Sequence, residues 1–71
     1  MEKVLMTKEE LAYGNYYALG VEMRRLRYID LPASIRPATN YFLRKNRKEP
    51  LIPEEFRALG LDLVETITDD D

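Results

Sequence analysis

Side chains that could carry out chemistry are scarce in this sequence. It contains no His and no Cys, which removes the commonest general base, the best nucleophile and the usual zinc ligands. Ser34 is the only serine, and no neighbouring pattern would activate it. Glu54 and Glu55 are better explained as the acidic first turn of a short helix than as a catalytic pair. The three glycines are too far apart for a phosphate-binding loop. The sequence therefore predicts a protein that is not an enzyme and uses no cofactor or metal.

Charge, in contrast, is distributed very unevenly. The net charge of −2 conceals a strongly basic segment, residues 24–48, which contains eight basic side chains and one acidic side chain, Asp30. Residues 49–71 contain eight carboxylates and only one cation, Arg57. Two interpretations are open. The two blocks could attract each other within the fold, or the basic block could contact an acidic partner, which would be nucleic acid or a protein surface.

The candidate partner-binding residues belong to this basic block. The first group is Arg24, Arg25, Arg27 and Tyr28, and the second group is Arg44, Lys45, Arg47 and Lys48. Tyr13, Tyr17, Arg24 and Tyr28 also fall on one stripe of a helix, and Tyr and Arg are enriched at the energetic centres of protein interfaces. In the opposing interpretation the tyrosines pack at the edge of the core, and the cations are solvated charges near the C-terminal ends of helices.

Helical periodicity indicates the elements that position these residues. Thr7 and Glu10 form a capping box, so a helix is expected over residues 8–29. Its core face is predicted from apolar residues at steps of four and three, namely Ala12, Tyr16, Leu19, Met23 and Leu26. Gly14 and Gly20 weaken a helix, so we expect that another backbone approaches closely there or that the helix bends.

Prolines and glycines divide the rest of the chain. Pro37 suits the first turn of a second helix over residues 37–47, which would bury Ala38, Tyr41, Phe42 and the aliphatic stem of Lys45. A short third helix is expected over 54–59, and Gly60 would end it in the left-handed conformation. Residues 61–67 then alternate as a short strand would, and this segment could pair with residues 4–6.

The elements together predict a mainly α, small single domain of two to three helices with a short two-stranded terminal β pairing. Residues 1–68 would form the domain, and residues 69–71 an acidic, disordered tail. No apolar run approaches the roughly 20 residues of a membrane span, and the N-terminal residues do not resemble a signal peptide. We expect a cytoplasmic monomer.

In its size, its lack of catalytic side chains and its split charge, the chain resembles the small host-takeover proteins of lytic bacteriophages. More narrowly, it is similar to an RNA polymerase-binding transcription regulator of a phage that infects Xanthomonas. The resemblance runs from Met1-Glu2-Lys3-Val4-Leu5-Met6 to Asp69-Asp70-Asp71. It implies a protein that docks on bacterial RNA polymerase, inhibits promoter-specific initiation and permits read-through of terminators.

Two other hypotheses fit the same residues. The first is a small phage DNA-binding regulator, such as a repressor or an excisionase-like protein, for which the basic block would contact phosphates. The connection over residues 30–36 is too long for the tight turn of a helix-turn-helix, and the acidic last third would repel DNA. The second is a protein inhibitor of the toxin–antitoxin kind, which would share the interface but differ in its target.

Overall fold

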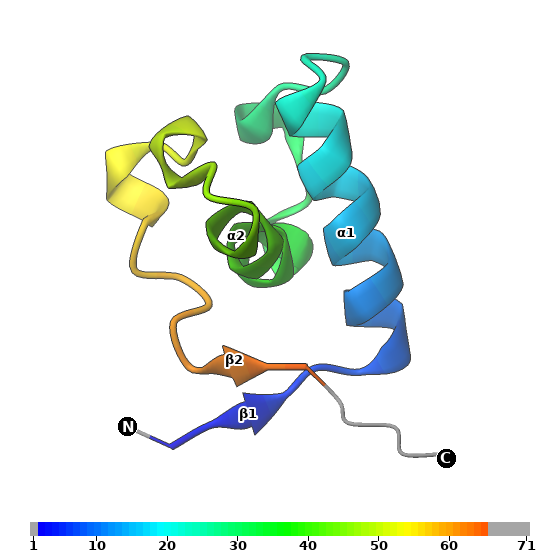
Figure 1. Ribbon diagram of the computed structural model, residues 1–71, viewed down its shortest axis with the longest axis vertical. Helices are drawn as coiled ribbons and strands as arrows, with labels where there is room; N and C mark the ends of the chain where they lie inside the picture. Colours follow the sequence, from blue (N-terminus) through cyan, green and yellow to red (C-terminus); the bar gives the residue numbers. More distant parts are fainter. Residues whose placement is uncertain (1, 66–71) are drawn as a thin grey trace.

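The computed structural model describes residues 2–65 as a mainly helical domain with a short strand pair, as the sequence predicted (Figure 1). Within these residues no helix is long and apolar enough to cross a membrane. The elements follow one another as β1 (Val4–Leu5), α1 (Lys8–Glu22), 3-10 helices at Tyr28–Asp30 and Ala33–Ile35, α2 (Arg36–Lys45), 3-10 helices at Glu49–Leu51 and Glu54–Phe56, and β2 (Leu63–Val64).

Helix α1 begins where the sequence predicted and ends earlier. The Thr7 amide donates to Oε1 of Glu10 at 2.7 Å, and the Glu10 amide donates to Oγ1 of Thr7 at 3.0 Å, so the predicted capping box is present. The helix ends at Glu22 and not at residue 29, because Arg24 adopts a left-handed conformation with φ of 61°. The chain then turns and continues into the 3-10 helix at Tyr28–Asp30.

The predicted core face of α1 is wrong. The helix buries Gly14, Ala18 and Val21, whereas Tyr16, Leu19 and Met23, all expected in the core, are exposed. The reason is the close crossing of α1 and α2. A Cβ atom added at Gly14 would lie only 2.8 Å from Cβ of Ala38, so only small residues fit between the two backbones. The close approach expected at a glycine is therefore confirmed for Gly14. Leu26, the last residue of the predicted face, lies beyond the end of α1 and is partly buried against the core.

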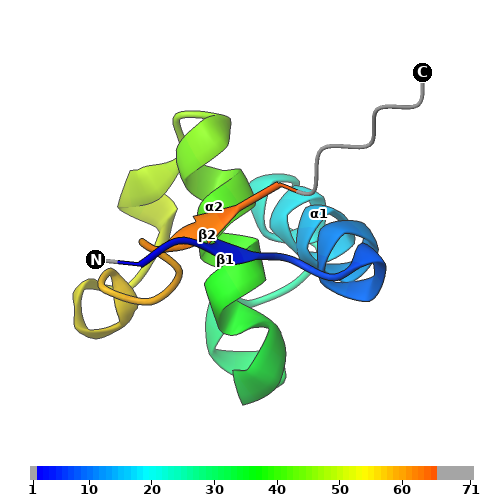
Figure 2. The ribbon, with the colours of Figure 1, turned by 90° about the horizontal axis from the view of Figure 1, so that it is seen from below.

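Helix α2 is the centre of the fold. It spans Arg36–Lys45, close to the predicted 37–47, and it packs against α1 and against β2. In Figure 2 the strand pair lies across α2. The buried residues of α2 are Ala38, Thr39, Asn40, Phe42 and Leu43. Tyr41, predicted in the core, is partly buried, and Lys45 is exposed, so its stem does not belong to the core.

The expected pairing of the terminal segments is confirmed, and it is parallel. Val4 lies opposite Leu63, and the Met6 amide donates to the carbonyl of Val64 at 3.0 Å. The predicted helix at 54–59 is a 3-10 helix at Glu54–Phe56 alone, and Gly60 supplies the expected left-handed turn with φ of 81°. Residues 66–67 of the predicted strand and the predicted tail at 69–71 lie outside the described residues.

Candidate functional site

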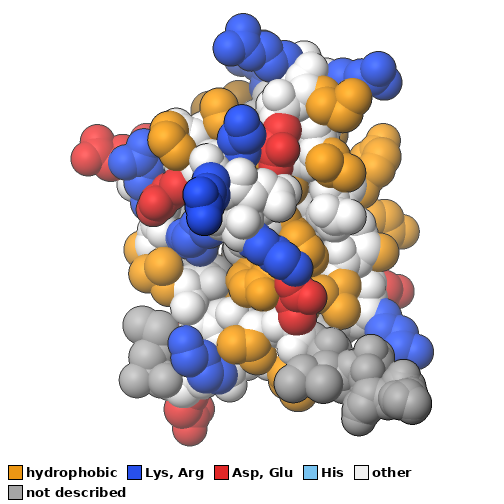
Figure 3. All heavy atoms as spheres, viewed as in Figure 1, with side chains coloured by type: hydrophobic (Ala, Val, Ile, Leu, Met, Phe, Trp, Pro, Cys, Tyr) orange, Lys and Arg blue, Asp and Glu red, His pale blue; other side chains and the backbone are white. Residues whose placement is uncertain are grey.

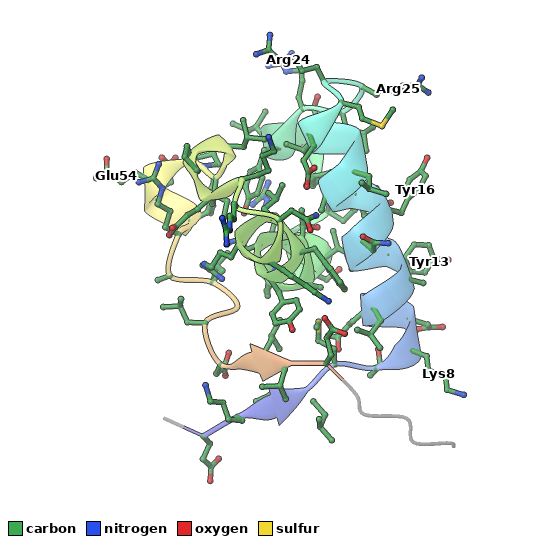
Figure 4. The ribbon with its side chains drawn as sticks, in the orientation of Figure 1. Lys8, Tyr13, Tyr16, Arg24, Arg25 and Glu54 are labelled. Carbon is green, nitrogen blue, oxygen red and sulfur yellow. The ribbon has the colours of Figure 1, made fainter. Side chains whose placement is uncertain are left out.

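Three of the predicted binding residues gather in the turn after α1. Arg24, Arg25 and Arg27 are all exposed, and Figure 4 shows Arg24 and Arg25 extending from the top of the molecule. The turn forms because the Arg24 and Arg25 amides donate to carbonyls of the last turn of α1, at 3.0 and 2.8 Å. Cations are favourable at this end of a helix because the dipole is negative there. We call these three residues the arginine cluster.

Within residues 2–65 the arginine cluster has little compensating negative charge. The only ion pair that it makes there joins Nε of Arg27 to Oδ2 of Asp30 at 3.8 Å, and both side chains are exposed. An exposed pair of this kind contributes little to stability, so a partner could displace it at small cost. The arginine cluster is therefore an accessible source of positive charge.

Tyr28, predicted as part of the same contact surface, is a core residue. Only 6% of it is exposed, and its hydroxyl donates to Oδ1 of Asn40 at 2.6 Å. Burial raises the pKa of Tyr28 above its ordinary value, and the hydrogen bond to Asn40 opposes that rise. The ring also packs against Phe56, with centroids 5.6 Å apart. Tyr28 cannot touch a partner in this conformation, so we correct its assignment.

Asn40 connects Tyr28 to the segment that follows α2. Its Nδ2 donates to the carbonyl of Phe56 at 2.7 Å and to that of Leu59 at 3.3 Å, and Asn40 itself is completely buried. Arg36 closes the same region from outside, with its guanidinium carbon 4.6 Å from the centre of the Phe56 ring. These contacts hold the turn that follows the arginine cluster against the body of the protein.

The second predicted group divides into inward and outward residues. Arg44 points inward, since its Nη2 donates to the carbonyls of Leu59, at 2.9 Å, and of Arg57. Its Nε and Nη1 are shielded from solvent and have no hydrogen-bond partner among the described residues. Arg47 and Lys48 lie in the turn after α2 and are exposed. Only these two members of the second group, together with the arginine cluster, remain available in full.

Lys45 forms an ion pair with Glu65. The hydrogen bond to Lys45 lowers the pKa of Glu65, and the same bond raises the pKa of Lys45. The hydroxyl of Tyr41 donates to Oε2 of Glu65 at 3.1 Å, and burial followed by this bond raises the pKa of Tyr41. Here the basic block and the acidic block attract each other, as one of the two interpretations expected.

Sequence reasoning missed an exposed apolar surface on the outer side of α1. It consists of Tyr13, Tyr16, Leu19 and Met23, and we call it the α1 outer face. Three of these four residues had been assigned to the core. The signal that could have found the true core face is the pair Gly14 and Ala18, because small residues four apart on a helix allow a second backbone to approach.

Comparison with protein-family models, with curated proteins and with solved structures finds no match to this chain. Among residues 2–65 no group of three or more His, Cys, Asp or Glu side chains is placed to hold a metal ion. The function is therefore argued from the surface itself, in which an exposed arginine cluster lies at the end of a helix with an exposed apolar face.

Proposed function

We propose that the protein is a non-enzymatic transcription regulator that binds bacterial RNA polymerase in the cytoplasm of the host cell. Binding would inhibit initiation and permit read-through of terminators, as the phage resemblance implies. The observation that carries the proposal is the exposure of Arg24, Arg25 and Arg27 in one turn, where Asp30 is the only acidic partner among the described residues. A surface of this kind suits an acidic site on a large protein.

The placement of the cations favours a protein over a DNA duplex. Proteins that read DNA commonly lay an exposed basic helix in the major groove. Half of the ten residues of α2 are buried, and Arg44 on this helix points inward. The exposed cations of the arginine cluster, with Arg47 and Lys48, occupy turns at the ends of α1 and α2 instead, and Arg25 adjoins the apolar α1 outer face. Mixed apolar and arginine surfaces are characteristic of protein interfaces.

The test is direct binding to purified RNA polymerase from Xanthomonas, combined with promoter-directed transcription. The wild-type protein should bind the enzyme and suppress initiation. Reversing two charges of the cluster, by Arg25→Glu with Arg27→Glu, should weaken binding by about tenfold or more, which corresponds to about 1.4 kcal/mol. The helical circular dichroism should not change, because both side chains are exposed.

A matched control separates position from net charge. The double variant Lys3→Glu with Lys8→Glu makes the same charge change, and Figure 4 places Lys8 at the opposite end of α1 from Arg24 and Arg25. Its affinity should remain close to that of the wild type. Equal losses in the two double variants would mean that total charge matters and the arginine cluster does not. A wild-type protein that fails to bind the polymerase would refute the proposed function.

The competing hypothesis of a DNA-binding regulator makes a different prediction. The affinity for a duplex would then fall with salt, with a log–log slope of about −0.9 for each phosphate neutralised. Electrophoretic retardation of duplexes at low salt measures this directly. Suppose that the wild-type protein retards a duplex, that the arginine-cluster variant does not, and that the wild-type protein leaves the polymerase unbound. The DNA-binding function would then replace our proposal.

A further inference from the structure

The α1 outer face carries four large hydrophobic side chains that are exposed. The exposed fractions are 55% for Tyr13, 64% for Tyr16, 43% for Leu19 and 57% for Met23. Figure 4 shows Tyr13 and Tyr16 pointing away from the body of the protein, and in Figure 3 hydrophobic side chains gather along that edge. If a large apolar side chain offers about 200 Å² in full, the four expose about 400 Å² together. Apolar patches of this size on small monomers often mark binding sites.

A hollow lies at the end of this face nearest the arginine cluster. Its volume is about 260 Å³, and its lining consists of Tyr16, Leu19, Gly20, Met23, Arg25 and Leu26. A cavity of about 150 Å³ can hold a benzene ring, so one aromatic or branched aliphatic side chain would fit here. Gly20 contributes no side chain to the hollow, and Leu26 packs over it.

Positive charge borders the hollow on one side. Arg25 contributes directly to the lining, and Arg24 and Arg27 belong to the same exposed turn. Figure 3 shows basic side chains above the apolar edge, and Figure 4, in the same orientation, labels Arg25 there. An occupant with an apolar side chain in the hollow would therefore place its adjacent residues beside guanidinium groups. Carboxylates at those positions would form charge-assisted hydrogen bonds.

We infer that the α1 outer face and its hollow bind a short acidic segment of the polymerase. One apolar side chain of this segment fills the hollow, and an Asp or Glu residue beside it pairs with Arg25, the cation that lines the hollow. The inference rests on the proposed function and adds to it the chemistry of the partner segment. The apolar contact supplies affinity, while Arg25 fixes the direction in which the segment lies.

The area of the face argues against a second copy of this chain as the occupant. A stable interface buries about 800 Å² on each partner, and the α1 outer face offers about half of that. Two copies joined across this face would therefore associate weakly. A segment that also engages the arginine cluster gains the missing contacts from charge. Such a small anchor is suited to a short segment and not to a broad protein surface.

The test compares the polymerase affinity of two alanine variants, both of which must be folded. Tyr16→Ala with Leu19→Ala should weaken binding to purified RNA polymerase by about tenfold or more. The control is Leu61→Ala, which removes a side chain of 51% exposure in the segment just before β2, and Figure 1 shows this segment away from α1. This control should bind as the wild type does. Alanine is the best helix former, so the circular dichroism of the α1 variant should remain helical.

The identity of the partner segment is tested by crosslinking. A benzophenone side chain at position 19 should crosslink to one polymerase segment in which apolar residues alternate with Asp or Glu, and the same group at position 61 should not. A crosslink to a basic segment would overturn the inference. Full polymerase affinity in the Tyr16 and Leu19 variant would also overturn it and would leave the proposed function intact. Absence of wild-type binding would overturn both.

One further outcome identifies the alternative occupant. Sedimentation equilibrium of the protein alone should show a monomer. A dimer that Leu19→Ala dissociates would show that a second copy covers the α1 outer face, and the inference would then be wrong.

Discussion

Asn40 is the residue whose replacement tests the fold most sharply. Its side chain makes two short hydrogen bonds and one long one, to the Tyr28 hydroxyl at 2.6 Å, the Phe56 carbonyl at 2.7 Å and the Leu59 carbonyl at 3.3 Å. Asn40→Ala removes all three and leaves the buried Tyr28 hydroxyl without its acceptor. At about 1 kcal/mol for each of the two short hydrogen bonds, with a further 1–3 kcal/mol for a stranded buried group, we expect a loss of about 3–5 kcal/mol.

This loss is large for so short a chain. A domain of this length has a free energy of unfolding of roughly 4–10 kcal/mol, so Asn40→Ala removes a third of it or more. Urea denaturation followed by far-ultraviolet circular dichroism measures the change. With a urea dependence of about 1 kcal/mol per molar for a small protein, the midpoint should fall by about 3 M or more. The turn that carries the arginine cluster should loosen as well, because Tyr28 follows it directly.

The matched control is Asn46→Ala. Asn46 is exposed, and its Nδ2 donates to Oε2 of Glu22 at 2.9 Å, so the same substitution should cost less than about 0.5 kcal/mol. A loss below about 1 kcal/mol for Asn40→Ala, or equal losses at the two asparagines, would refute the argument that buried polar contacts hold α2 to the segment after it.

Two further substitutions test the helix crossing and the ion pair. Gly14→Ala should destabilise the protein by about 1–3 kcal/mol in the same urea assay, because the new Cβ would meet Cβ of Ala38 at 2.8 Å. Adding Ala38→Gly should recover part of the lost stability. If the double variant recovers none, the strain does not lie at this contact. Lys45→Gln should lower the urea midpoint at neutral pH and have a smaller effect in acid, since the folded-state pKa of Glu65 lies below its ordinary 4.5. The ion pair of Lys45 with Glu65 therefore stabilises the fold when the pH is above the ordinary pKa of a glutamate. This stabilisation is lost as the pH falls through the lowered pKa of Glu65.

The control for the ion pair is Lys48→Gln, because Lys48 is exposed and makes no ion pair with a described residue. Its urea midpoint should differ from that of the wild type by the same small amount at every pH. If Lys45→Gln shows no more dependence on pH than Lys48→Gln does, the contact with Glu65 contributes nothing in solution.

Local signals in the sequence were enough to predict the beginnings and ends of several elements. The capping box of Thr7 and Glu10 is formed by residues three apart, and the left-handed turn at Gly60 depends on one residue. Such features are readable because their energy comes from neighbours in the chain. The end of α1 was not predicted, because the residue in the left-handed conformation there is Arg24 and not Gly or Asn.

The buried face of α1 could not be read from hydrophobicity alone. Two faces of α1 carry residues at helical spacing that could pack in a core. The face with the larger apolar side chains is exposed. The face that packs is the one with small residues, because α2 approaches within contact distance of Gly14. Which face is buried therefore depended on a partner helix that lies more than twenty residues further along the chain.

The exposure of the candidate binding residues was predicted in part. Charge segregation pointed to a segment in which Arg24, Arg25, Arg27, Arg47 and Lys48 are exposed, and their binding to a partner stays a prediction. It could not separate these from Arg44 and Lys45, which have contacts with residues beyond 56 in the sequence. Tyr28 was misassigned for a similar reason, since its hydroxyl is satisfied by Asn40 and not by solvent.

The parallel pairing of β1 with β2 has a consequence for the order of folding. Nearly the whole described chain lies between these two strands. Forming the pair therefore closes a very long loop, which costs chain entropy, and gains only a few hydrogen bonds. Contacts of such long sequence separation form slowly, whereas the helices need only their neighbours. The strands should therefore join after α1 has docked on α2. Substitutions at Val4 or Leu5 would then accelerate unfolding and leave the rate of folding almost unchanged.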